Sequence, residues 1–69
     1  MFILTQDEKT VFNSAYFTYF ACNSKGEVFL GYEGGGLLLG KYATEERAKE
    51  VVRELFVCVD YSRYEMPIV

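Results

Sequence analysis

The chain has 69 residues, the length of one small domain whose core is only marginally stable without further support. Seven basic residues against ten acidic ones give a net charge of −3, which argues against a nucleic-acid partner because such binding depends on Lys and Arg side chains that neutralise phosphates. A transmembrane helix needs about 20 consecutive apolar residues, and no apolar run in this chain approaches that length. The sequence therefore also predicts no membrane partner.

The sequence offers few residues for metal binding or catalysis. It contains no histidine, and its two cysteines, Cys22 and Cys58, do not form a C-x-x-C pair. Without a histidine, neither a cysteine nor a serine has the usual base that activates a nucleophile. The first ten residues lack the basic start of a secretory signal, which predicts a cytoplasmic protein with reduced thiols. We therefore expect no enzymatic activity, no cofactor and no metal.

The apolar content predicts self-association. Hydrophobic residues make up 51% of the chain and aromatic residues 17%, a large load for so small a domain. A domain of this size cannot bury all of these side chains, and large exposed apolar patches mark interfaces. We expect a homodimer.

The first forty residues read as strands. Residues 2–5 and 10–13 flank a polar turn and predict a hairpin. Residues 15–22 are aromatic and β-prone, and they are apolar on both faces. A strand of this kind is covered on both faces, so a single helix on one side leaves the other face for a partner or for exposed tyrosines.

The next strands are separated by short loops. Residues 23–26 predict a hairpin turn, after which Glu27–Tyr32 pairs back. Residues 33–36 form a glycine-rich loop before a strand over 37–42. Because consecutive strands with short connections are usually neighbours, the simplest arrangement is an antiparallel meander.

A helix follows, over residues 44–59. Thr44 is a candidate N-cap, with Glu45 and Glu46 in the first turn, where the helix dipole favours negative charge. The tail over 60–69 is predicted to dock as an edge strand, since Pro67 limits pairing to an edge. An apolar stripe at helical spacing predicts that the helix lies flat on the sheet; it comprises Ala48, Val51, Val52, Leu55, Phe56 and Val59.

These patterns predict an α+β fold. We expect one domain over residues 1–69, with strands over 2–42, a helix over 44–59 and a tail over 60–69. The strands should form a small antiparallel sheet of four to five strands, with the amphipathic helix packed on one face.

Two groups of residues are candidates for binding. Gly34, Gly35 and Gly36 make either a flexible hairpin loop or a loop that closes over a ligand, because glycine N–H groups can converge on an anion. Tyrosines combine apolar area with a hydrogen-bonding tip, which suits interfaces and stacking. Tyrosines also pack within and around small cores, so core packing, a protein interface and ligand stacking all stay open as roles. The predicted contacts are Tyr16, Tyr19 and Tyr32.

Three short patterns carry a resemblance to a known group. They are T-Q-D-E-K at residues 5–9, G-K-Y-A-T-E-E-R-A-K-E-V at 40–51 and Y-E-M-P at 64–67. Together they resemble small, mostly uncharacterised proteins of phages and prophages in Gram-positive bacteria. The resemblance covers both ends of the chain, and its motifs mark a turn, a helix entry and a tail. It implies a phage accessory protein acting in the cytoplasm of the host bacterial cell, a class that often inhibits host defence.

The sequence therefore favours a non-enzymatic protein that binds and inhibits a host protein, such as one of anti-phage defence. One alternative is an oligomeric sponge that sequesters a nucleotide-type signalling molecule. Another is a structural component of the phage particle.

Overall fold

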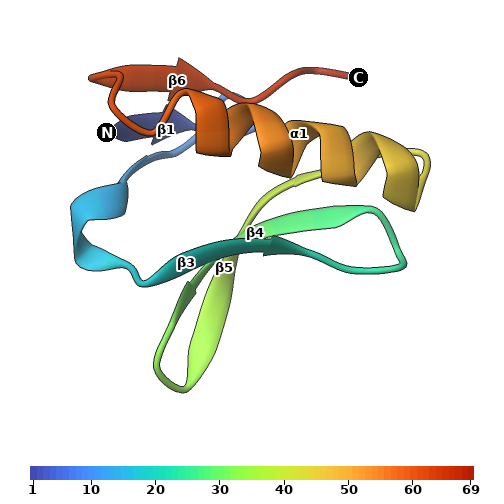
Figure 1. Cartoon of the computed structure of the whole chain (residues 1–69), viewed down its shortest axis with the longest axis horizontal. Helices are drawn as coiled ribbons and strands as arrows, with labels where there is room; N and C mark the ends of the chain where they lie inside the picture. Colours follow the sequence, from blue (N-terminus) through green and yellow to red (C-terminus); the bar gives the residue numbers. More distant parts are fainter.

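The computed structural model describes residues 1–69 and consists of strands in two separate sheets, with one α-helix (Figure 1). The elements in chain order are β1 (Phe2–Leu4), β2 (Val11–Asn13), the short 3₁₀ helix η1 (Ser14–Tyr16), β3 (Tyr19–Cys22), β4 (Glu27–Tyr32), β5 (Gly35–Lys41), α1 (Glu45–Val57) and β6 (Arg63–Glu65).

The first sheet joins both ends of the chain, in the order β2-β1-β6. Strands β1 and β2 form the predicted antiparallel hairpin, with Ile3 opposite Phe12. On the other side β1 pairs in parallel with β6, which places Ile3 opposite Tyr64. The tail therefore docks as an edge strand, as predicted.

The second sheet is the predicted meander, in the order β3-β4-β5. Both pairs are antiparallel, and the register places Tyr19 opposite Gly31 and Gly31 opposite Gly36. The register between β4 and β5 shifts next to Val28, where Leu39 is the extra residue of a β-bulge.

The helix begins as the sequence predicts. The Thr44 side chain accepts a hydrogen bond from the Arg47 N–H at 3.1 Å, which caps the first turn. Its apolar face is buried at Ala48, Val51 and Leu55. The helix ends at Val57, before the predicted end at residue 59.

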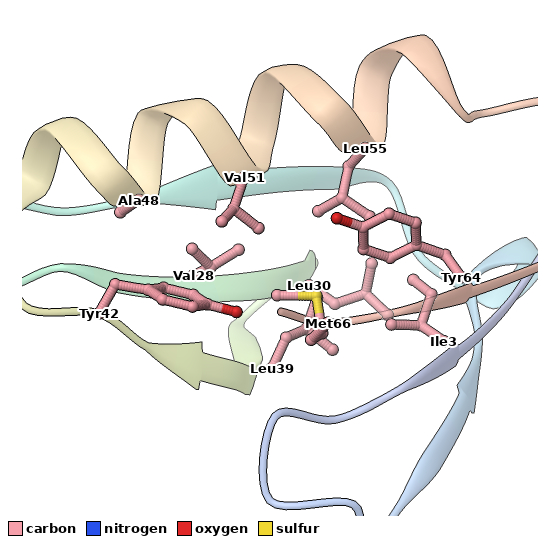
Figure 2. Close-up of a cluster of buried hydrophobic side chains, with 10 residues drawn as sticks. All are labelled: Ile3, Val28, Leu30, Leu39, Tyr42, Ala48, Val51, Leu55, Tyr64 and Met66. Carbon is pink, nitrogen blue, oxygen red and sulfur yellow. The ribbon is translucent and has the colours of Figure 1, made fainter. Parts of the chain in front are cut away.

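Ten buried side chains from both sheets, the helix and the intervening segments form one core (Figure 2). They are Ile3, Val28, Leu30, Leu39, Tyr42, Ala48, Val51, Leu55, Tyr64 and Met66. The helix packs on β3 and β4, and the first sheet closes the remaining side of the core.

The prediction of one sheet of four to five strands was wrong. Residues 14–16 form η1, capped by the Asn13 side chain, so the strand predicted over 15–22 shortens to Tyr19–Cys22. This break separates β2 from β3 and divides the strands between two sheets. The glycine loop predicted over 33–36 is also shorter, because Gly35 and Gly36 pair with β4 as part of β5.

Candidate functional site: two open sheet faces and a closed tail

The turn after β1, the end of β5 and the tail meet at one side of the molecule. The Gln6 N–H donates to the Leu39 carbonyl at 2.8 Å, and its side-chain oxygen accepts from the Lys41 N–H at 2.6 Å. Its side-chain amide donates to the Ile68 carbonyl at 2.7 Å. Gln6 thus ties the first hairpin to β5 and to the tail.

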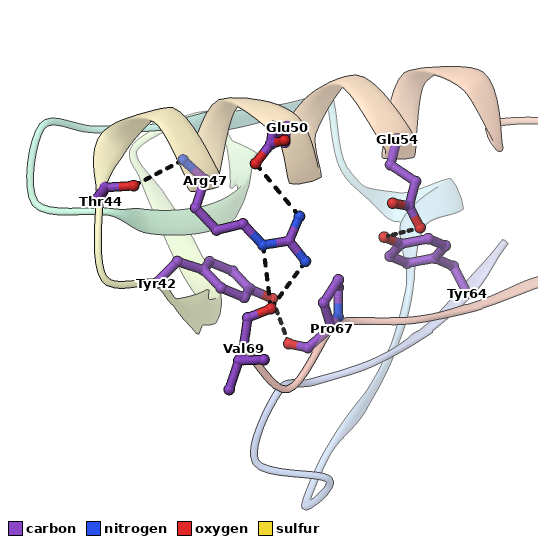
Figure 3. Close-up of polar contacts among 8 residues, drawn as sticks. All are labelled: Tyr42, Thr44, Arg47, Glu50, Glu54, Tyr64, Pro67 and Val69. Carbon is purple, nitrogen blue, oxygen red and sulfur yellow. Dashed lines mark hydrogen bonds and ion pairs between the residues drawn. The ribbon is translucent and has the colours of Figure 1, made fainter.

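The segment before α1 and the first turn of α1 hold the tail by further polar contacts (Figure 3). The Tyr42 hydroxyl donates to the Pro67 carbonyl at 2.8 Å. The Arg47 guanidinium donates to the main-chain oxygen of Val69 at 2.9 and 3.2 Å and lies 5.7 Å from the centre of the Tyr42 ring, within reach of a cation–π contact. We call these contacts, with those of Gln6, the tail network.

A second tyrosine fixes the tail to the far end of the helix. The Tyr64 hydroxyl donates to a Glu54 carboxylate oxygen at 2.9 Å (Figure 3). Burial raises the pKa of Tyr64 well above its usual range, and the hydrogen bond to Glu54 raises this pKa further. Burial also raises the pKa of Tyr42. Both hydroxyls are therefore neutral hydrogen-bond donors at physiological pH.

The turn between β1 and β2 is closed by its own side chains. Thr5 donates its hydroxyl to Asp7 at 2.6 Å, and the Lys9 N–H donates to the same carboxylate oxygen at 3.0 Å. These hydrogen bonds, the Thr5 hydroxyl first, hold the pKa of Asp7 below its usual value. The turn, the helix entry and the tail are thus held by intramolecular contacts.

The outer face of the first sheet, by contrast, is open and hollowed. An apolar groove of about 650 Å³ lies over it, lined by Phe2, Leu4, Val11, Ser62, Arg63, Tyr64 and Glu65. Phe2 and Val11 are 55% and 57% exposed although they sit in strands. Ile3, the residue after Phe2, points the other way into the core, because successive strand residues face opposite sides.

Two charges of opposite sign border this groove. Arg63 and Glu65 lie on β6 with the same orientation, opposite Phe2 and Leu4. The chain contains one ion pair, Arg47 with Glu50, so neither Arg63 nor Glu65 has an ionic partner within the chain. An apolar floor with free charges at the rim is the chemistry of a protein interface.

The outer face of β3-β4-β5 is a second apolar surface. The register puts Tyr19, Ala21, Phe29 and Leu38 on the side away from the core, together with Gly31 and Gly36. Leu38 is 55% exposed, and Tyr19 is exposed as well. The expectation that the face of this strand away from the helix carries exposed tyrosines is met at Tyr19.

The predicted tyrosines do not form one site. The Tyr19 ring lies directly over Gly31, so that a Cβ added to Gly31 would lie 2.1 Å from the ring. Tyr19 therefore belongs to the outer face. Tyr32, one residue after Gly31, points to the opposite face, where its hydroxyl lies over Gly35 and its ring makes an edge contact with Phe17 at 6.0 Å. Tyr16 is 81% exposed at the end of η1.

The predicted glycine site is the tip of a hairpin. Gly34 has a φ of 90° at the second position of the two-residue turn between β4 and β5, and that conformation favours glycine. Gly35 and Gly36 are extended residues paired with Tyr32 and Gly31. Their N–H groups point to alternate sides of the strand and do not converge on one point.

The groove residues Phe2, Leu4, Val11, Arg63 and Glu65 were not predicted as a site. A signal was present, because Phe2-Ile3-Leu4 is apolar on both faces, as residues 15–22 are. The partner strand β6 gave no such signal, since Arg63 and Glu65 reach the groove only through a pairing across the whole chain.

Comparisons with known proteins find no match: no family model, no curated protein and no solved structure matches this chain significantly. The structure contains no group of three or more His, Cys, Asp or Glu side chains placed to hold a metal ion. None of its helices has the length and apolar character needed to cross a membrane.

Proposed function

We propose that this protein is a non-enzymatic inhibitor that binds another protein through the groove on β2-β1-β6. The resemblance of its end motifs points to a phage accessory protein, and the target is then a protein of the bacterial host, with a defence protein as the leading candidate. The observation that carries the proposal is the groove itself, an open apolar hollow of about 650 Å³ on a domain of 69 residues.

The chemistry of the groove supports a protein as the ligand. Its floor is made of Phe2, Leu4 and Val11, which suits apolar side chains of a partner. Arg63 and Glu65 stand at its rim with opposite charges, and both lack an internal ion pair. Such charges steer and orient a partner more than they add affinity. A complementary partner therefore presents one or two apolar anchors flanked by an acidic and a basic residue.

The proposal is tested with three immobilised forms of the protein and a bacterial host lysate. Val11→Lys places a charge in the groove at an exposed strand position, so the fold is kept while apolar contacts are lost. Val57→Lys is the matched control, because Val57 is 69% exposed at the end of α1, outside the groove. We expect wild type and Val57→Lys to retain the same partner at equal amounts, and Val11→Lys to lose it.

Two outcomes count against the proposal. If no partner is retained in stoichiometric amounts by wild type, the protein is not an inhibitor of that host's proteins. If Val11→Lys retains the partner as well as wild type does, binding uses another surface.

A further inference from the structure

We propose that a second copy of this chain pairs with the exposed edge of β5, so that two β3-β4-β5 sheets join into one continuous six-stranded sheet. This inference uses a different sheet from the groove and does not rest on the proposed function. It concerns the backbone of residues 36–38.

The register of the hairpin identifies which backbone groups of β5 are free. Tyr32 and Gly35 close a two-residue turn and form a hydrogen-bonded pair. In antiparallel strands such pairs alternate with pairs that exchange no hydrogen bond. Gly36, opposite Gly31, and Leu38, opposite Phe29, are therefore of the second kind, and their N–H and C=O groups point away from β4. No further strand lies on that side.

The rest of the β5 edge is already closed. Beyond Leu38, the Leu39 carbonyl and the Lys41 N–H are bonded by Gln6. The bulge at Leu39 and the charge of Lys41 are also features that discourage pairing at an edge. The open part is thus limited to residues 35–38, which carry neither a charge nor a proline.

The other strand edges are less suited to pairing. β2 and β6 have three residues each, and β6 carries Arg63 and Glu65 with Pro67 shortly after it. β3 has four residues, and α1 lies close to it. The hairpin formed by β4 and β5, by contrast, projects away from α1, β1 and β6 (Figure 1). A projecting edge without charges is a template for pairing with another chain.

A second copy fits this edge better than an unrelated strand because the edge is complementary to itself. With Gly36 opposite the partner's Leu38 in antiparallel register, each N–H faces a C=O, and two-fold symmetry repeats the arrangement. Leu37 then lies on the symmetry axis. Because the two strands run antiparallel, the Glu33 turn of one copy points toward the end of the pairing where the partner's Lys41 lies. Neither Glu33 nor Lys41 has an ion pair within the chain.

Charge-reversed variants test this register. Glu33→Lys and Lys41→Glu each place like charges at both ends of the pairing, so each variant alone should dimerise about tenfold more weakly than wild type. In a mixed dimer, the two substituted positions face each other at one end and the two unchanged positions face each other at the other end. Opposite charges then meet at both ends, so an equimolar mixture should recover the wild-type affinity to within about threefold. The measurement is mass against concentration by sedimentation equilibrium, starting from a monomer of 7.9 kDa.

Amide exchange gives an independent readout that does not depend on a substitution. The Gly36 and Leu38 N–H groups of wild type should exchange slowly with deuterium at high protein concentration and faster on dilution, followed by NMR. The Ser24 N–H, in the exposed turn between β3 and β4, is the internal control and should not depend on concentration.

Three results would overturn the proposal. One is a monomer at all concentrations up to about 1 mM. Another is a dimer in which the Gly36 and Leu38 amides stay unprotected, since this shows association through a sheet face. The third is a mixture of the two charge variants that associates no better than either alone.

Discussion

The tail network and the β4–β5 hairpin satisfy their backbone in different ways. In the tail network, the side chains of Gln6, Tyr42 and Arg47 bond main-chain groups of β5 and the tail. In the hairpin, the outward groups of Gly36 and Leu38 have no partner within the chain, and the exposed side chains are apolar. The residues used for stability thus lie on one side of the domain, and the surfaces available to a partner lie elsewhere.

The largest expected difference in stability is between substitutions on the two faces of the second sheet. Leu30 is 1% exposed in the core, and Leu38 is 55% exposed on the outer face. Leu30→Ala should lower the free energy of unfolding by about 2–5 kcal/mol, through lost burial and a cavity. Leu38→Ala should lower it by less than about 1 kcal/mol. Urea unfolding of both variants measures the difference. Equal losses would show that the outer face is covered.

A glycine near the tail network and a glycine at the hairpin tip give the next largest contrast. Both have positive φ, but a Cβ on Gly26 would lie 2.3 Å from the Tyr42 carbonyl oxygen, whereas a Cβ on Gly34 would meet nothing within 4 Å. Gly26→Ala should cost about 3 kcal/mol, from the conformation and the clash together. Gly34→Ala should cost about 1 kcal/mol, from the conformation alone. Thermal unfolding of the two variants tests this order.

Removing the Gln6 side chain should open the tail network locally. Gln6→Ala removes the hydrogen bonds to Lys41 and Ile68, which are partly replaced by water because the site is exposed. We expect a loss of about 1 kcal/mol and faster deuterium exchange at the Lys41 amide. Lys9→Ala, an exposed position in the same turn, is the control and should leave that exchange unchanged. Equal exchange rates in wild type and Gln6→Ala would contradict the role of Gln6.

A comparable effect at neutral pH is expected where Tyr64 bonds the far end of the helix. The pKa of Tyr64 is raised in the folded state, so the protein is stabilised below the unfolded-state value of 10.0, and this contribution is lost as the pH rises above it. Tyr64→Phe should cost about 1 kcal/mol at pH 7 through the lost bond to Glu54. Unfolding of wild type and variant followed from pH 8 to about pH 11 should show a smaller loss of stability in the variant. Parallel curves would rule out the contribution of Tyr64.

The local elements were predictable from the sequence. The hairpin over the first residues, the strand Glu27–Tyr32 and the helix with its Thr44 cap all follow from patterns within a few residues of each other. Such patterns reflect interactions between residues close in the chain, so they can be read before the tertiary contacts are known. The uncovered face of β3 was also predictable, because apolar residues on both sides of a strand exceed what one helix covers.

The tertiary structure alone decided how these elements combine. The parallel pairing of β1 with β6 joins residues about sixty positions apart, and no local spacing encodes it. That pairing sets Arg63 and Glu65 beside Phe2 and Leu4 and so creates the groove. Tyr19 and Tyr32 lie on opposite faces because Tyr19 pairs with Gly31. A shift of one residue between β3 and β4 would place both tyrosines on the same face. Contacts between distant segments arise from packing of the whole core, and the candidate sites are made of such contacts.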